Sequence, residues 1–103
     1  MQLRALDERE LSVAGECLRA AADGPFFPDW EFVIVFGVDR EAVRAVAERW
    51  PEIGDDTTAE AALLNSLNNL WGYPIDHESD WSAWVSMPRE SLPALIGKLR
   101  GDA

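Results

Sequence analysis

The sequence predicts a small, mainly α-helical fold that forms one domain over residues 1–103. Three stretches carry apolar side chains at helical spacing, and an aspartate or threonine that can cap a helix precedes each of them. Glycine or proline, which commonly end helices, follows each stretch. A chain of 103 residues has the length of one domain. We therefore expect a single-domain multi-helix fold, with an α+β fold as the alternative.

The first helix has the clearest sequence signals. Asp7 can cap it, and Glu10 follows three residues later, which is the spacing of a capping box. Apolar residues then repeat with the period of a helix, at Leu11, Ala14, Leu18 and Ala21. The glycine–proline pair at 24–25 should end this helix.

The segment 30–36 fits two secondary structures. Its β-branched and aromatic residues favour a buried strand. Its flanks favour a short helix, which Asp29 would cap and which Gly37 would end in the left-handed conformation. Residues 81–87 place apolar side chains on alternate positions, which predicts a half-buried strand. If 30–36 is also a strand, the two should pair in an α+β fold; if it is helical, 81–87 should lie extended on a mainly α fold.

The next helix should be capped by Asp39 and ended by Pro51. Arg44 and Glu48 lie one turn apart, a spacing at which an ion pair contributes about 0.2–0.5 kcal/mol. The apolar stripe of this helix consists of Val43, Val46, Ala47 and Trp50.

Two further helices are expected in the second half of the chain. Thr57 and Glu60 have the spacing of a second capping box at the start of one of them, and Gly72 should end it. Its predicted inward-facing residues are Leu63, Leu67, Leu70 and Trp71. The last helix should cover about residues 89–100, with Pro93 tolerated in its first turn.

Charge is distributed unevenly along the chain, and the formal net charge is -10. No lysine or arginine lies between Arg49 and Arg89, whereas seven carboxylates do. These are Glu52, Asp55, Asp56, Glu60, Asp76, Glu78 and Asp80. Such a charge repels nucleic acid phosphates and anionic membranes. We therefore expect a basic protein partner, and neither nucleic acid nor membrane.

The sequence indicates a cytoplasmic protein without a cofactor or a metal. It shows no signal peptide and no apolar run of spanning length. Residues 76–80, Asp-His-Glu-Ser-Asp, offer oxygen and nitrogen ligands, but the glycine and glutamate of an EF-hand are missing. One histidine without a nearby cysteine is a poor zinc site.

No motif commits the chain to a catalytic mechanism, so we expect that it is not an enzyme. A thiol–imidazole dyad of Cys17 and His77 is a remote alternative. Cys17 lies beside the apolar stripe of the first helix, however, and a free cysteine in such a place usually packs as a small hydrophobe.

Residues 36–44 resemble the turn and second helix of a helix-turn-helix motif. In a DNA-binding domain of this kind, Arg40 and Arg44 would face the groove. Glu41 and Glu48 on the same helix, together with the net charge, oppose this interpretation. A transcription-associated domain is therefore the alternative function.

A binding surface is predicted in the acidic half of the chain. The outward side of the helix over 57–71 carries asparagines, which are unusual on an exposed helix face and suit the centre of an interface. Trp84 shares a face with two serines and is a candidate aromatic anchor. The alternative is that the asparagines bond to neighbouring loops. The predicted partner-binding residues are Asn65, Asn69, Tyr73, Asp76, Glu78, Asp80 and Trp84.

Two tracts resemble a widespread set of short, acidic, uncharacterised bacterial proteins. One reads ECLRAA over residues 16–21, DWEF over 29–32 and FGV over 36–38, and the other reads LNSLNNLWGYP over 64–74. This resemblance brings no established activity. In size and charge the chain is also similar to small immunity or antitoxin-type proteins, which implies that it binds and neutralises or regulates a basic protein. Whether it forms homo-oligomers stays open.

Overall fold

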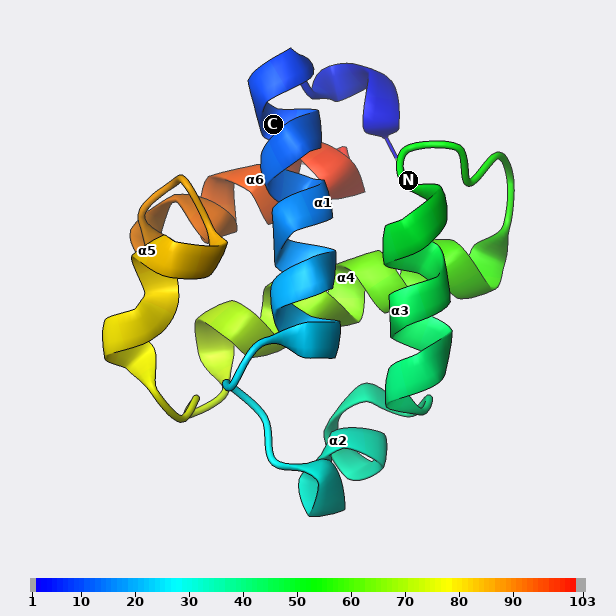
Figure 1. The fold of residues 1–103 in the computed structure, drawn as a ribbon. Helices are drawn as coiled ribbons and strands as arrows, with labels where there is room; N and C mark the ends of the chain where they lie inside the picture. The colour runs from blue at the N-terminus through cyan, green and yellow to red at the C-terminus, as the bar shows by residue number, and fades with distance from the viewer. Residues whose placement is uncertain (1, 102–103) are drawn as a thin grey trace.

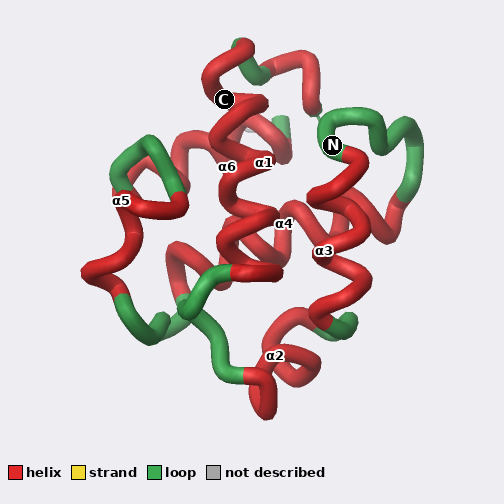
Figure 2. The backbone as a smooth tube through the Cα atoms, viewed as in Figure 1, coloured by secondary structure: helices red, strands yellow, loops and turns green. Residues whose placement is uncertain are grey.

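The computed structural model describes residues 2–101 as helices joined by short loops (Figure 1), so residues 1 and 102–103 of the predicted domain lie outside the description. The α-helices are α1 (Glu8–Asp23), α2 (Asp29–Phe36), α3 (Arg40–Arg49), α4 (Thr57–Gly72), α5 (Trp81–Trp84) and α6 (Leu92–Arg100). Single 3-10 turns lie at Leu3–Ala5, Glu78–Asp80 and Arg89–Ser91. Within residues 2–101 there is no strand (Figure 2), which confirms the prediction of a small multi-helix fold.

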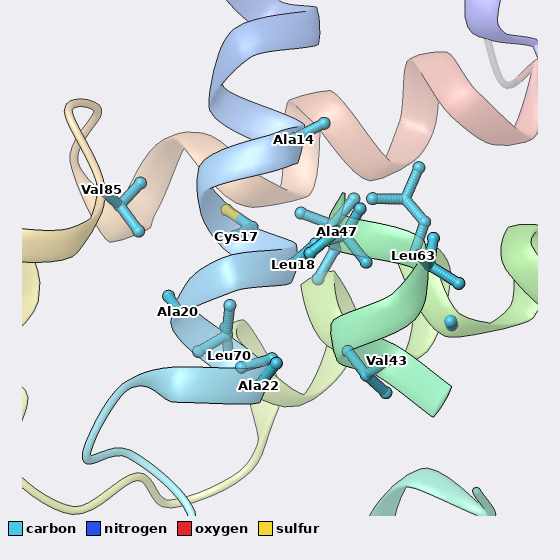
Figure 3. Close-up of a cluster of buried hydrophobic side chains, with 14 of the residues drawn as sticks. Ala14, Cys17, Leu18, Ala20, Ala22, Val43, Ala47, Leu63, Leu70 and Val85 are labelled. Carbon is cyan, nitrogen blue, oxygen red and sulfur yellow. The ribbon is translucent and has the colours of Figure 1, made fainter. Parts of the chain in front are cut away.

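Helix α1 lies at the centre of the fold and packs mainly against α3 and α4. Its inward face is made of small and medium-sized side chains, which allow the neighbouring helices to approach closely. Figure 3 shows Cys17 and Leu18 of α1 in one buried cluster with Ala47 of α3 and Leu63 of α4. The predicted apolar stripe of α1 therefore forms the core, although Leu11 at its first turn stays partly exposed.

The capping box of α1 is confirmed. The backbone N–H of Glu10 donates to Oδ1 of Asp7 at 2.8 Å, and the N–H of Asp7 donates to Oε1 of Glu10 at 3.0 Å. Lys98 of α6 donates to the other oxygen of Glu10 at 2.7 Å. The hydrogen bonds from Lys98 and from the Asp7 N–H lower the pKa of the Glu10 carboxyl group. The start of α1 is thus tied to the last helix of the chain.

Asp39 caps α3 as predicted, since its Oδ1 accepts from the N–H of Ala42 at 2.9 Å. The capping residue of α4 is Asp56 instead of the predicted Thr57. Oδ1 of Asp56 accepts from the backbone N–H groups of Thr58 and Ala59. The guanidinium of Arg49 donates to Oδ2 of Asp56 at 2.7 Å. An ionised carboxylate that a cation holds in place is a stronger acceptor than a hydroxyl, which accounts for the shift by one residue. These hydrogen bonds lower the pKa of the Asp56 carboxyl group, and the bond from Arg49 has the largest effect.

The ambiguous segment 30–36 is helical and forms most of α2. Gly37 ends this helix with φ 74, in the left-handed conformation that the sequence predicts. Pro28 occupies the N-cap position, so Asp29 is the first helical residue instead of the cap. The rings of Phe32 and Phe36, one turn apart, stack with centroids 4.1 Å apart and are buried.

The predicted strand over 81–87 is wrong, because no residue of this segment is in a strand. Residues 81–84 form α5, and Val85 follows in an extended conformation. Trp81 and Val85 are buried while Ala83 between them is exposed, as expected when residues four positions apart share one face of a helical turn and the residue between them does not. Nε1 of Trp81 donates to the carbonyl of Met87 at 2.8 Å, which closes the segment on itself. The alternation of apolar and polar residues over only seven positions could not distinguish a strand from a helical turn followed by a loop.

Two smaller expectations are also wrong. Trp71 was expected to face inward, but it is 40% exposed, and the guanidinium of Arg89 lies 6.0 Å from its ring. Arg44 pairs with Asp23 and Glu41 instead of Glu48. Arg44 thus pairs with Asp23 at the end of α1 and with Glu41 one turn earlier in its own helix, and these two carboxylates take the place of Glu48. The last helix begins at Leu92, after the 3-10 turn, with proline in its first turn as predicted.

Gly15 allows α1 and the end of α3 to approach each other. Nε1 of Trp50 donates to the carbonyl of Leu11 at 2.8 Å, and this bond lays the indole over Gly15. A Cβ atom at Gly15 would lie 2.6 Å from Cδ1 of Trp50, closer than packed carbon atoms can come. At Gly97 of α6, by contrast, no atom lies within 4 Å of the position of an added Cβ.

Gly15→Ala should therefore lower the free energy of unfolding by about 1–2 kcal/mol, because the overlap with the indole outweighs the better helix propensity of alanine. Gly97→Ala is the matched control and should raise the free energy of unfolding by up to about 1 kcal/mol. Urea denaturation of both variants measures the difference. If Gly15→Ala is as stable as Gly97→Ala, the indole does not pack against α1 as described.

Candidate functional site

Helix α2 presents large apolar side chains to solvent. Trp30 is 75% exposed, Val33 54% and Ile34 78%. Residues three and four positions apart share one face of a helix, so these three side chains form a single surface, here called the α2 face. The opposite side of the helix packs inward through Phe32 and Phe36. α2 lies at one end of the fold, where it contacts α3 and α4 (Figure 1).

Arg40 holds α2 against the rest of the fold. Its guanidinium donates to the carbonyl oxygens of Ala22 at 3.0 Å, Phe27 at 2.8 Å and Ala21 at 3.3 Å. It also lies 3.0 Å from a carboxylate oxygen of Asp29 and 4.4 Å from the centre of the Phe32 ring. One side chain from α3 thus joins the end of α1, the following loop and α2.

The predicted asparagines support α2 from the other side. The side-chain amide of Asn65 donates to the carbonyl of Phe36 at 3.0 Å, and that of Asn69 donates to the carbonyl of Val35 at 3.4 Å. Both residues are half-buried, and Ser66 between them is fully buried. The expectation of an open asparagine face is therefore wrong. Bonding to a neighbouring segment, the alternative interpretation, accounts for these residues, because the last carbonyls of a helix need donors from elsewhere.

Tyr73 also contacts α2. It follows the last residue of α4, and its hydroxyl donates to Oε2 of Glu31 at 3.4 Å. Its ring lies beside that of Phe27, with centroids 6.4 Å apart. Desolvation raises the pKa of the Tyr73 hydroxyl, and the charge of Glu31 raises it further. Three of the predicted site residues, Asn65, Asn69 and Tyr73, therefore meet at α2.

The other predicted carboxylates lie in the loop and 3-10 turn before α5. Asp76, Glu78 and Asp80 are all exposed. Glu78 accepts from Arg89 at 3.0 Å, and Oδ2 of Asp80 lies 3.9 Å from Nδ1 of His77. In the described part of the chain, no three potential metal ligands are grouped closely enough to hold an ion. This acidic loop is a solvated surface of one charge sign.

Trp84 lies apart from the rest of the predicted site. It is half-buried and packs on the core at the edge of a groove of about 490 Å³. Trp50 at the end of α3 lines the same groove, with Glu16 and Arg19 of α1. The predicted residues are thus distributed among the support of α2, the acidic loop and this groove, and do not form one surface.

Carboxylates surround the α2 face in the sequence. Between residues 23 and 41 there are five of them and one arginine. The carboxylates are Asp23, Asp29, Glu31, Asp39 and Glu41. The side chain of Asp29 is 95% exposed and that of Glu41 78%, whereas Arg40 is only 19% exposed. The guanidinium of Arg40 thus points into the fold, while the carboxylates of Asp29 and Glu41 lie at the surface.

The helix-turn-helix alternative needs Arg40 and Arg44 at the surface. α2, the turn at Gly37 and α3 do follow one another as such a motif requires. Arg40, however, is occupied by backbone carbonyls, and Nε of Arg44 donates to Asp23 at 2.7 Å. These bonds to Asp23 and Glu41 raise the pKa of Arg44. Both side chains serve the fold, so this geometry gives the DNA-binding hypothesis no support.

The α2 face was missed at the sequence level, although one signal pointed to it. The segment 30–36 is apolar on every side, with Glu31 as its sole charged residue. A helix of this composition in a small domain can bury only one face against its neighbours. Recognising the segment as a helix would therefore have implied an exposed apolar face.

Loss of Arg40 should destabilise the fold. Arg40→Ala leaves three carbonyl oxygens without this donor, so we expect the free energy of unfolding to fall by about 2–4 kcal/mol. Arg19→Ala removes an exposed arginine from α1 and should change the free energy of unfolding by less than about 0.5 kcal/mol. Thermal and urea denaturation compare the two variants. Equal losses would contradict the role assigned to Arg40.

Cys17 should be unreactive in the folded protein. It is fully buried, and burial raises its pKa far above the usual range. His77, its partner in the alternative dyad, lies in the acidic loop with 63% of its side chain exposed. We expect an alkylating reagent at neutral pH to label Cys17 more than about a hundredfold more slowly than in denaturant. Fast labelling of the folded protein that is lost in His77→Ala would support the enzyme alternative.

None of the helices in the described residues 2–101 combines the length and the apolar character that crossing a membrane requires. Comparison of the chain with known protein families, with curated proteins and with solved structures found no match.

Proposed function

We propose that the chain is a cytoplasmic, non-enzymatic interaction protein that binds a basic protein and neutralises or regulates it. The mode of action is that of an immunity or antitoxin protein, in which an acidic surface covers the functional surface of the partner. The single observation that carries this proposal concerns where the charges lie: cations are held in contacts within the fold, whereas several carboxylates are exposed to solvent.

Five of the nine basic side chains, Arg40, Arg44, Arg49, Arg89 and Lys98, are held in contacts within the fold, whereas Arg4, Arg9, Arg19 and Arg100 are exposed. Arg40 and Arg89 donate to backbone carbonyls at the ends of helices, and the other cations with a partner reach carboxylates. The pairs with carboxylates are Arg40–Asp29, Arg44–Asp23, Arg44–Glu41, Arg49–Asp56, Arg89–Glu78 and Lys98–Glu10. Each cation in such a contact has little freedom to meet an external anion.

Several carboxylates, in contrast, point into solvent. Glu52, Asp55 and Asp76 are exposed, and they lie in the part of the chain that carries no lysine or arginine. Exposed charges of one sign produce a long-range field that accelerates the approach of an oppositely charged protein. Salt screens this field over about 10 Å at 0.1 M ionic strength. Binding driven in this way should therefore be fast and sensitive to salt.

The proposal is tested by capture of a partner on the immobilised protein from the native host at about 50 mM and about 500 mM salt. A captured basic protein is then purified, and its association rate with the isolated chain is measured. We expect capture at low salt that weakens at high salt. Failure to capture a basic protein at either salt concentration would contradict the proposal.

The triple variant Glu52→Gln, Asp55→Asn, Asp76→Asn should slow association by about tenfold at low salt, because it removes part of the attracting field. At high salt the difference should disappear. The triple variant Glu52→Asp, Asp55→Glu, Asp76→Glu keeps the charge at the same positions and is the matched control. Stopped-flow measurements on both variants check this. An equal association rate for the neutralised and control variants would contradict a charge-driven encounter.

A further inference from the structure

We propose that the α2 face, made of Trp30, Val33 and Ile34, is the docking site for a basic amphipathic helix of the partner protein. This inference rests on the proposed function and adds to it the contact surface and the kind of segment that binds there. The acidic loop before α5 then contributes attraction over distance, while the α2 face makes the direct apolar contact.

α2 leaves a large apolar area in water. Trp30 is 75% exposed and Ile34 is 78% exposed. Tryptophan is the residue type most often found among the side chains that dominate binding energies. With Val33 these residues form a ridge at positions i, i+3 and i+4, the pattern by which one helix packs against another.

Carboxylates outnumber cations around this ridge. Asp39 between the two helices is exposed, and so are Asp29 and Glu41, which pair with Arg40 and Arg44 respectively. Arg40 is turned into the fold and Arg44 also pairs with Asp23, so two arginines stand against the five carboxylates Asp23, Asp29, Glu31, Asp39 and Glu41. An apolar ridge with an acidic rim is complementary to a helix that carries apolar residues on one side and lysine or arginine along its edges.

The backbone of α2 is already fixed in place by neighbouring side chains. Arg40 holds its first turn through Asp29 and Phe32, while Asn65 and Asn69 bond the carbonyls at its end. A surface held on a fixed backbone loses little conformational entropy on binding. The α2 face can therefore bind a partner without first becoming ordered.

A second copy of this chain fits the same face poorly. Two α2 faces in contact would bring their acidic rims together, and each chain carries a formal net charge of -10. A stable interface also covers about 800 Å² on each partner, which is more than three side chains of one short helix supply. The repulsion between like charges therefore favours a partner of opposite charge over a second copy.

The test uses two fluorescently labelled synthetic helical peptides of about 16 residues with identical lysine content. One carries leucine along its apolar face, and the other carries alanine at the same positions. We expect the wild-type protein to bind the Lys/Leu peptide at least about tenfold more tightly than the Lys/Ala peptide, as measured by fluorescence anisotropy. In the double variant Trp30→Ser, Ile34→Ser, the affinity for the Lys/Leu peptide should fall to that for the Lys/Ala peptide.

Trp71→Ser is the matched control, because Trp71 is also partly exposed but belongs to α4. It should leave the affinity for the Lys/Leu peptide unchanged. Circular dichroism confirms that each variant is folded, which is expected because the substituted side chains lie at the surface. If the double variant binds the Lys/Leu peptide as tightly as the wild type does, the inference is overturned.

The outcomes separate this inference from the proposed function. If the wild type binds both peptides equally at low salt, charge attraction stands and the α2 face is overturned as the docking site. If neither peptide binds at low salt, both the inference and the charge-driven function fail. If sedimentation shows a dimer that Ile34→Ser dissociates, the face belongs to a second copy, which also overturns the inference.

Discussion

The position of α2 depends on the guanidinium of Arg40. It brings together the last carbonyls of α1, the carbonyl of Phe27 in the following loop, the Asp29 carboxylate and the ring of Phe32. A planar cation with several donors in fixed directions can satisfy such a set of acceptors, whereas a lysine ammonium has neither the plane nor the reach. The same contact turns a positive charge away from the surface, so the arrangement of the helices and the acidity of their outer side have a common origin.

The elements that could be predicted are those whose signals are local. The capping box of Asp7 and Glu10, the cap at Asp39 and the left-handed Gly37 involve residues within one turn of each other. The residues that were misjudged, by contrast, depend on distant partners. Asn65 and Asn69 follow the pattern of an exposed face, but their amide groups bond to α2, 29 and 34 residues away in the sequence. Nothing within a helical window contains that information.

The candidate site divides in the same way. The acidity of the segment between Arg49 and Arg89 can be counted in the sequence, and its carboxylates at Asp76, Glu78 and Asp80 are exposed in the structure. The exposure of Trp30 and Ile34 could not be derived, because it follows from which side of α2 contacts the fold. A segment that is apolar on every side does not reveal which side that will be.

The ends of α1 and α4 share one further property. Neither ends in a left-handed glycine; instead, Arg40 and Arg89 donate to their last carbonyls. These arginines lie 18 and 19 residues further along the chain than the carbonyls of Ala22 and Leu70 that they bond. The final turns of both helices can therefore be completed only after later segments have docked. Helix termination here is a tertiary event, which couples the helices and favours cooperative, all-or-none folding of the chain.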